Sequence, residues 1–222
     1  MIKNPYLKKL INKNLGKDNE IFSKEELDSI VSLTIEDKID FYELRELVNL
    51  NELKIYNMEL STIELASIGK LNNLKELFII RCSVDGIRQL DGMSLDTLYI
   101  SDSFVDDFMF INNINVNNLY LENMGEIDLK DISIIRNVTS LSLDNTIVSN
   151  EDKMIFLDKI INLSIFNTGI KNIDTLVEND TLKMLVIDEE IYKNNILVVK
   201  KLKSRDVLVV NDMNQDVESC YD

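Results

Sequence analysis

The stretch Leu163–Leu176, LSIFNTGIKNIDTL, decides the fold because it is one copy of a pattern that runs through most of the chain. Its opening unit has the form L-x-[LI], in which two apolar residues flank a variable one. The unit begins at Leu33, Leu53, Leu77, Leu98, Leu119, Leu141, Leu163 and Leu185, with a weaker ninth copy at Val207. Successive copies are 20 to 24 residues apart and settle at 22. A period this narrow indicates a structural repeat.

Further apolar residues recur with the same period as the unit, three residues before each copy and five residues after it. Examples are Ile160 before Leu163 and Ile170 after Ile165. One such unit cannot bury its apolar face alone, whereas stacked units share a continuous core. We therefore predict an α/β solenoid, with a curved parallel sheet on its concave face and helices and turns on its convex face.

The pattern resembles the leucine-rich repeat of the internalin and SDS22-like class, a bacterial form with 21–22-residue repeats. The resemblance spans roughly residues 20–210. In that class an Asn three residues after the second strand residue usually bonds to turn backbone. Here Cys82, Ser103, Thr146 and Thr168 can partly replace it, whereas Lys38, Met58, Met124 and Glu190 depart from the pattern and predict a looser turn. We interpret Cys82 as a buried turn residue and not as a reactive thiol.

We predict one continuous domain in three parts: a helical amino-terminal cap (residues 1–30), the leucine-rich repeats (31–210) and an acidic, flexible tail (211–222). In the cap, Asn4-Pro5 starts a helix that Gly16 ends, and a capping box at Ser23 and Glu26 starts a second helix. At the other end we expect a helix from Ile191 to Lys203 and a strand from Val207 to Val210. Helical return segments are predicted at residues 40–47, at 62–70 and from Ser149 onward.

Composition excludes several functions. The chain has 222 residues, 24 Lys plus Arg against 39 Asp plus Glu, a net charge of −15 and no His. The lack of His excludes Ser-His-Asp or Cys-His nucleophiles and His-ligated metal. The acidity argues against nucleic acid and anionic membrane as partners. The sequence has no signal-peptide pattern and no membrane-length apolar run, so we expect a cytoplasmic protein.

The non-core residues of the strands should form columns on the concave face. The central column places Phe78, Tyr99 and Tyr120 in succession. A contiguous aromatic patch usually marks a contact surface, although aromatic residues can also simply cover a sheet or meet a second copy. The predicted partner-binding residues are Phe78, Tyr99, Tyr120, Tyr56, Ile80, Glu76, Asp102, Glu122, Asp144 and Phe166.

Charge is the second feature of the predicted face. Its columns hold two bases, Lys54 and Arg81, and ten acids: Glu36, Asp37, Glu52, Glu76, Asp102, Glu122, Asp144, Asp188, Glu189 and Asp206. Such a face would steer a basic partner. Alternatively, the predicted face is acidic only because the whole surface of the protein is acidic.

Internalin-type proteins use the concave face to hold another protein, so the resemblance implies protein recognition. We expect a non-enzymatic protein-binding module, monomeric on its own, with no cofactor, no metal and a basic protein partner. One alternative is an intracellular inhibitor or immunity-type protein that neutralises a toxin or enzyme. Less favoured are a self-associating structural protein and an enzyme that relies on carboxylates.

Overall fold

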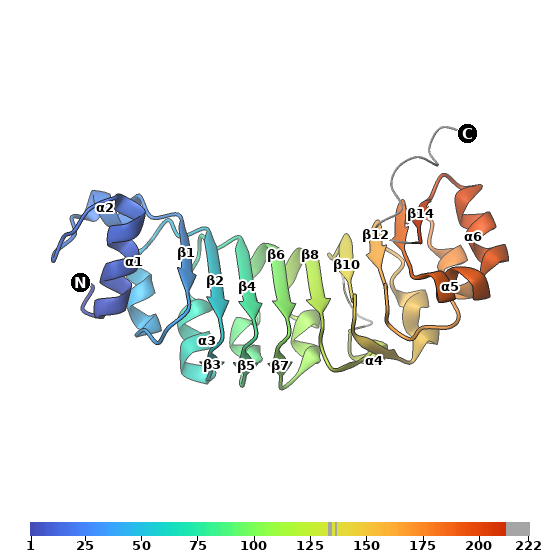
Figure 1. Ribbon diagram of the computed structural model, residues 1–222, viewed down its shortest axis with the longest axis horizontal. Helices are drawn as coiled ribbons and strands as arrows, with labels where there is room; N and C mark the ends of the chain where they lie inside the picture. Colours follow the sequence, from blue (N-terminus) through green and yellow to red (C-terminus); the bar gives the residue numbers. More distant parts are fainter. Residues whose placement is uncertain (133–134, 136, 212–222) are drawn as a thin grey trace. The chain divides into compact units, whose positions relative to one another are not determined.

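The computed structural model describes residues 1–132, 135 and 137–211, which pack as two units divided after Val116. Along the chain, short strands alternate with helices and turns, as the repeat predicts (Figure 1). The predicted tail, residues 211–222, lies outside the described residues except for Asn211.

The first unit begins with two helices, α1 (Pro5–Leu15) and α2 (Lys24–Asp28). The Asn4 side chain accepts a hydrogen bond from the Leu7 backbone at 2.9 Å, and Gly16 ends α1 in a left-handed conformation with φ of +64°. Ser23 and Glu26 form the reciprocal capping box of α2. The predicted beginnings of both helices and the end of α1 are therefore confirmed.

Four parallel strands of the first unit lie side by side: β1 (Ser32–Ile35), β2 (Glu52–Tyr56), β4 (Glu76–Ile80) and β6 (Ser94–Ser101) (Figure 1). Their first apolar residues stand opposite one another, and each is at most 1% exposed: Leu33, Leu53, Leu77 and Leu98. The predicted register is confirmed for these strands. Because successive side chains alternate, the variable residues point away from this core.

The return segments of the first unit are short. A second parallel sheet joins β3 (Glu59–Leu60), β5 (Ser83–Val84) and β7 (Phe104–Val105). Between the sheets run α3 (Thr62–Ile68) and three 3-10 helices, η1 (Phe41–Glu46), η2 (Ile87–Leu90) and η3 (Phe108–Asn112). The helix predicted at 62–70 is confirmed. The segment predicted at 40–47 is a 3-10 helix, which advances further per residue and so suits a short return.

The second unit contains the strands β8 (Asn115–Glu122, mostly in this unit), β10 (Ser140–Ser142), β12 (Asn162–Ser164), β13 (Met184–Val186) and β14 (Leu208–Val210), in this order and parallel. A small pair joins β9 (Glu126–Asp128) to β11 (Ile147–Ser149). The remaining elements are α4 (Leu129–Ile132), η4 (Glu151–Phe156) and η5 (Asp174–Glu178). The helix predicted from Ser149 is therefore a 3-10 helix that starts two residues later.

The register predicted for the last strand is wrong by two residues. Leu208 pairs with Met184 and Val209 with Leu185, so Val209, not Val207, is the counterpart of the repeat's first Leu. The cause is a longer return, in which the single helix predicted from Ile191 to Lys203 is two helices, α5 (Glu189–Asn194) and α6 (Ile196–Lys203). Asp206 consequently lies in the turn before β14, with φ of +61°, and not on the strand column.

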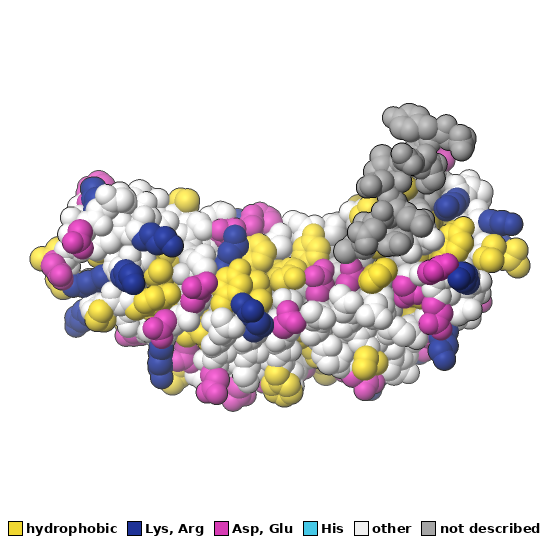
Figure 2. Space-filling view, in the orientation of Figure 1, with side chains coloured by type: hydrophobic (Ala, Val, Ile, Leu, Met, Phe, Trp, Pro, Cys, Tyr) yellow, Lys and Arg dark blue, Asp and Glu magenta, His cyan; other side chains and the backbone are white. Residues whose placement is uncertain are grey.

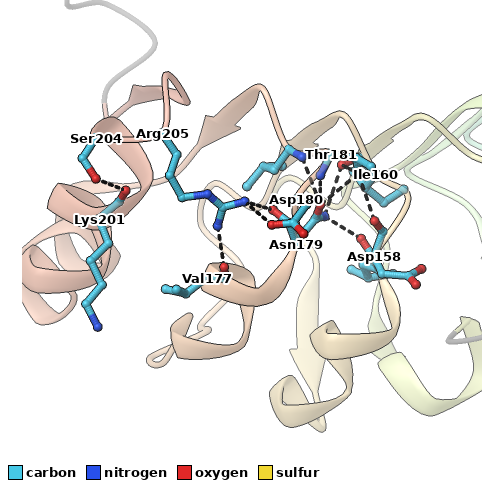
Figure 3. Close-up of polar contacts among 11 residues, drawn as sticks. Asp158, Ile160, Val177, Asn179, Asp180, Thr181, Lys201, Ser204 and Arg205 are labelled. Atoms are coloured by element: carbon cyan, nitrogen blue, oxygen red, sulfur yellow. Dashed lines mark hydrogen bonds and ion pairs between the residues drawn. The ribbon is translucent and has the colours of Figure 1, made fainter.

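A polar network fixes α6 to the preceding repeat (Figure 3). The Arg205 guanidinium donates to the backbone oxygens of Val177 and Asn179 and pairs with Asp180 at 2.8 Å. The Asn179 side chain, which belongs to a residue only 4% exposed, donates to two carbonyls of the repeat before and accepts from Thr181. Side-chain groups thus replace backbone hydrogen bonds where the turns of successive repeats meet.

The buried turn predicted for Cys82 is confirmed. Cys82 is 4% exposed, its backbone nitrogen donates to the Ser103 hydroxyl at 3.0 Å, and its Sγ lies 3.3 Å from the Ile80 carbonyl oxygen. Burial raises the pKa of the Cys82 thiol. In the second unit Thr146 has the role of Ser103, because its hydroxyl accepts from the Met124 backbone at 3.0 Å.

Candidate functional site

Two aromatic side chains meet at the centre of the sheet of the first unit. Phe78 on β4 and Tyr99 on β6 are register partners, and their ring centroids are 5.9 Å apart with a 39° tilt. Both residues are half-buried. Figure 2 shows hydrophobic side chains gathered over β4 and β6, with charged side chains at the margin. The predicted neighbours Phe78 and Tyr99 are therefore brought together on an accessible surface.

A lysine extends this aromatic pair toward β2. The Lys54 Nζ lies 5.0 Å from the centroid of the Phe78 ring and 2.8 Å from the Glu52 carboxylate. A cation within about 6 Å of a ring face is attracted by the ring quadrupole. The hydrogen bond to Glu52 raises the pKa of Lys54, and the bonds from Lys54 and then Ser32 lower the pKa of Glu52. Both groups are thus charged across the neutral pH range.

The other predicted residues of the first unit surround this centre. Tyr56 on β2 pairs in register with Ile80 on β4, and both are half-buried. Glu76 is also half-buried, beside Thr97 of β6. Asp102 is exposed just beyond β6 and has a left-handed backbone with φ of +49°. We define Phe78, Tyr99, Lys54, Tyr56 and Ile80 as the aromatic patch.

A residue with a left-handed backbone conformation recurs shortly after successive strands. In addition to Asp102, the positive φ angles at the equivalent positions belong to Asn57, Arg81, Asn123, Asn145 and Asn167. Asn and Asp adopt this conformation more readily than other residues with a side chain. Asp102 therefore forms part of the turn, in addition to being exposed on the surface.

The remaining predicted residues belong to the second unit. Tyr120 on β8 is half-buried and pairs in register with Ser142. Glu122 is the last residue of β8, and Asp144 and Phe166 follow β10 and β12; all three are half-buried. These four residues form a surface of the second unit, which we name the acidic surface.

The carboxylates of the acidic surface accept hydrogen bonds from the next repeat. Glu122 accepts from the Ser142 hydroxyl at 2.7 Å. Asp144 accepts from the Ser164 hydroxyl at 2.6 Å and from the Phe166 backbone at 2.8 Å. The predicted columns did not identify these serines as partners of the carboxylates, because each column groups only residues at equivalent positions of their strands. The available signal was a fixed offset of 20 residues between each acid and its serine.

The described residues contain neither a cluster of metal ligands nor a helix that could span a membrane. Among residues 1–132, 135 and 137–211, no three His, Cys, Asp or Glu side chains gather as a metal site. In the same part of the chain, every helix is too short or too polar to cross a bilayer. The two surfaces present half-buried rings and charged side chains on a parallel sheet.

Two solved structures from Listeria monocytogenes str. 4b F2365 are similar to this chain. An internalin (inlF) is 17% identical with a TM-score of 0.61, and the match covers 96% of this chain and 71% of that one. Internalin C2 (inlC2) is 16% identical with a TM-score of 0.57, and the match covers 95% of this chain and 87% of that one. No protein-family model and no curated protein sequence matches this chain. The likeness confirms the predicted fold, which is the leucine-rich repeat fold seen in internalins.

Proposed function

We propose that this chain is a non-enzymatic protein-recognition module whose main anchor is the aromatic patch. The observation that supports this most is the ordered contact of Phe78 with Tyr99 at 5.9 Å, extended by Lys54 over the Phe78 ring. Rings of this kind supply large contact area while losing little conformational entropy, and they are frequent anchors of protein interfaces. The resemblance to internalin repeats implies the same role.

We further propose that the protein partner is basic. In the aromatic patch itself Lys54 is paired with Glu52, so the local charge there is nearly balanced. The support comes from the acidic surface, where the half-buried carboxylates of Glu122 and Asp144 are each held by a serine hydroxyl of the next repeat. Carboxylates aligned in this way attract a cationic surface and raise its rate of association.

A capture experiment tests the proposal. The wild-type chain is compared with the variant Phe78→Ala/Tyr99→Ala/Tyr120→Ala, which removes both rings that meet in the aromatic patch and the Tyr120 ring of the acidic surface. Both proteins are immobilised and exposed to native lysate, and retained proteins are identified by mass spectrometry. The matched control is Phe104→Ala/Met109→Ala, which removes side chains of residues that are 67% and 50% exposed outside the patch.

We expect basic proteins that the wild type and the control retain and the triple variant loses. Circular dichroism verifies that the triple variant is folded. If the folded triple variant retains the same proteins as the wild type, the aromatic patch is not the binding site. If the retained proteins are acidic, the charge assignment is wrong.

A further inference from the structure

A second surface of the first unit lies at its amino-terminal end, away from the aromatic patch. A groove of about 840 Å³ is lined by residues from the start of the chain, from residues 20–28 and from residues 45–48. Met1, Ile21 and Val48 are 76%, 75% and 50% exposed, whereas Ile2 and Leu27 are buried. The groove therefore presents three large apolar side chains to solvent.

A row of lysines continues from this groove along α1. A neighbouring hollow of about 490 Å³ is lined by Lys3, Lys8, Lys9, Lys13 and Lys17, and Lys3 and Lys8 line the groove as well. Residues 1–17 contain these five lysines and no acidic residue, in a chain with a net charge of −15. The apolar groove and the lysine row thus form one continuous surface.

Part of this positive charge is free to meet a partner. Lys8 pairs with Glu20 at 3.1 Å and Lys17 with Glu26 at 2.6 Å. Lys3, Lys9 and Lys13 are exposed and make no ion pair with any residue in the part of the chain that the structure describes. Three acids, Glu20, Asp28 and Glu46, also line the groove, but Glu20 is paired with Lys8 and Glu46 with the amino terminus at 2.8 Å. Three unpaired lysines beside three exposed apolar side chains are therefore complementary to a ligand that carries carboxylates next to apolar groups.

We propose that this cap surface binds a short acidic peptide segment of a protein, with apolar side chains in the groove and carboxylates on the lysines. The rest of the chain, residues 18–222, has 39 acidic and 19 basic side chains. At physiological salt the screening length is about 8 Å, so a short segment experiences mainly the charges that line this surface, among which the lysines of residues 1–17 outnumber the acids of the hollow, Asp18 and Glu20. An extended polyanion such as a duplex or an anionic membrane would also face the acidic remainder. This surface is independent of the aromatic patch.

The test uses a fluorescein-labelled peptide of glutamate and leucine, with leucines at helical spacing, and measures fluorescence anisotropy with the whole chain. We expect a Kd in the micromolar range, and at least about tenfold weaker binding to Lys9→Glu/Lys13→Glu and to Ile21→Asp. The matched controls are Lys200→Glu/Lys201→Glu on α6 and Ile63→Asp on α3, at a residue that is 76% exposed. These controls and the triple variant Phe78→Ala/Tyr99→Ala/Tyr120→Ala should bind as the wild type does.

Several outcomes would overturn the proposal. One is equal binding of a peptide in which lysine replaces every glutamate, or serine every leucine. Another is an equal loss of binding in the control variants. Tighter binding to vesicles containing phosphatidylserine, lost in Lys9→Glu/Lys13→Glu, would assign the surface to lipid. A dimer in sedimentation velocity that Ile21→Asp dissociates would assign the groove to a second copy of the chain.

Discussion

The substitution Asn179→Ala should destabilise the second unit strongly, because one buried side chain joins two repeats (Figure 3). Its Nδ2 donates to the carbonyl oxygens of Leu157 at 2.7 Å and Ile160 at 3.2 Å. Its Oδ1 accepts from the backbone nitrogens of Thr181 at 2.8 Å and Leu182 at 3.0 Å, and from the Thr181 hydroxyl.

Alanine would leave two backbone groups without these partners, the nitrogens of Thr181 and Leu182. The Leu157 carbonyl keeps the Ile160 backbone nitrogen as a donor at 3.2 Å. The Ile160 carbonyl keeps the Thr181 hydroxyl at 3.0 Å. Each buried group left unsatisfied costs about 1–3 kcal/mol. We therefore expect the free energy of unfolding to fall by about 2–4 kcal/mol, a large part of the roughly 5–15 kcal/mol of a typical domain.

Urea unfolding followed by circular dichroism measures this loss for Asn179→Ala and for the control Asn49→Ala. Asn49 is exposed and its side chain donates one hydrogen bond, to the Asp28 carbonyl oxygen. The control should therefore lose about 1 kcal/mol or less. A loss below about 1 kcal/mol for Asn179→Ala as well would refute the reasoning, since the turn would then satisfy its backbone groups without this side chain.

Four further predictions concern single positions. A hydrogen bond from Lys130 lowers the pKa of Asp128 to about 2. The stability that Asp128 adds is therefore present above pH 4 and is lost as the pH falls from about 4 to 2. Asp128→Asn should flatten that part of a stability–pH curve measured by thermal unfolding. Gly86→Ala should lower the free energy of unfolding by about 2 kcal/mol or more, because φ is +86° and the new Cβ would lie 2.4 Å from a threonine oxygen. Gly92→Ala, with φ of +85° and open space, should cost about 1 kcal/mol in the same assay. With the other cysteine replaced, the Cys82 thiol should react with a thiol reagent only on unfolding, and fast labelling of the native chain would contradict its burial.

The strand positions could be predicted because each strand needs only two buried residues at a fixed spacing. A slip of one residue in a strand such as β4 would bring Phe78 into the core and expose Leu77. The register of the last strand was predicted wrongly because the repeat unit contains no residue that indicates the length of the return segment before it. Asn195 separates α5 from α6, and the longer return moves Val209 to the position expected for Val207.

The content of the candidate site could be predicted only in part. The register placed Phe78 beside Tyr99, and this contact is present. The partners of the carboxylates could not be derived from the columns, because a side chain that reaches the next strand can contact a residue at a different position along that strand. Ser142 contacts Glu122 in this way, and Ser164 contacts Asp144.

The acidity of the second unit therefore has two physical roles that must be separated before charge is assigned to recognition. Removing Asp144 removes a negative charge, but it also leaves the Ser164 hydroxyl and the Phe166 backbone without their acceptor. The amides Glu122→Gln and Asp144→Asn keep an acceptor oxygen and remove only the charge. If a basic partner is lost with the amide variants, charge attracts it. If it is lost only with alanine, the carboxylates act by holding successive repeats in register, and the aromatic patch must supply the specificity.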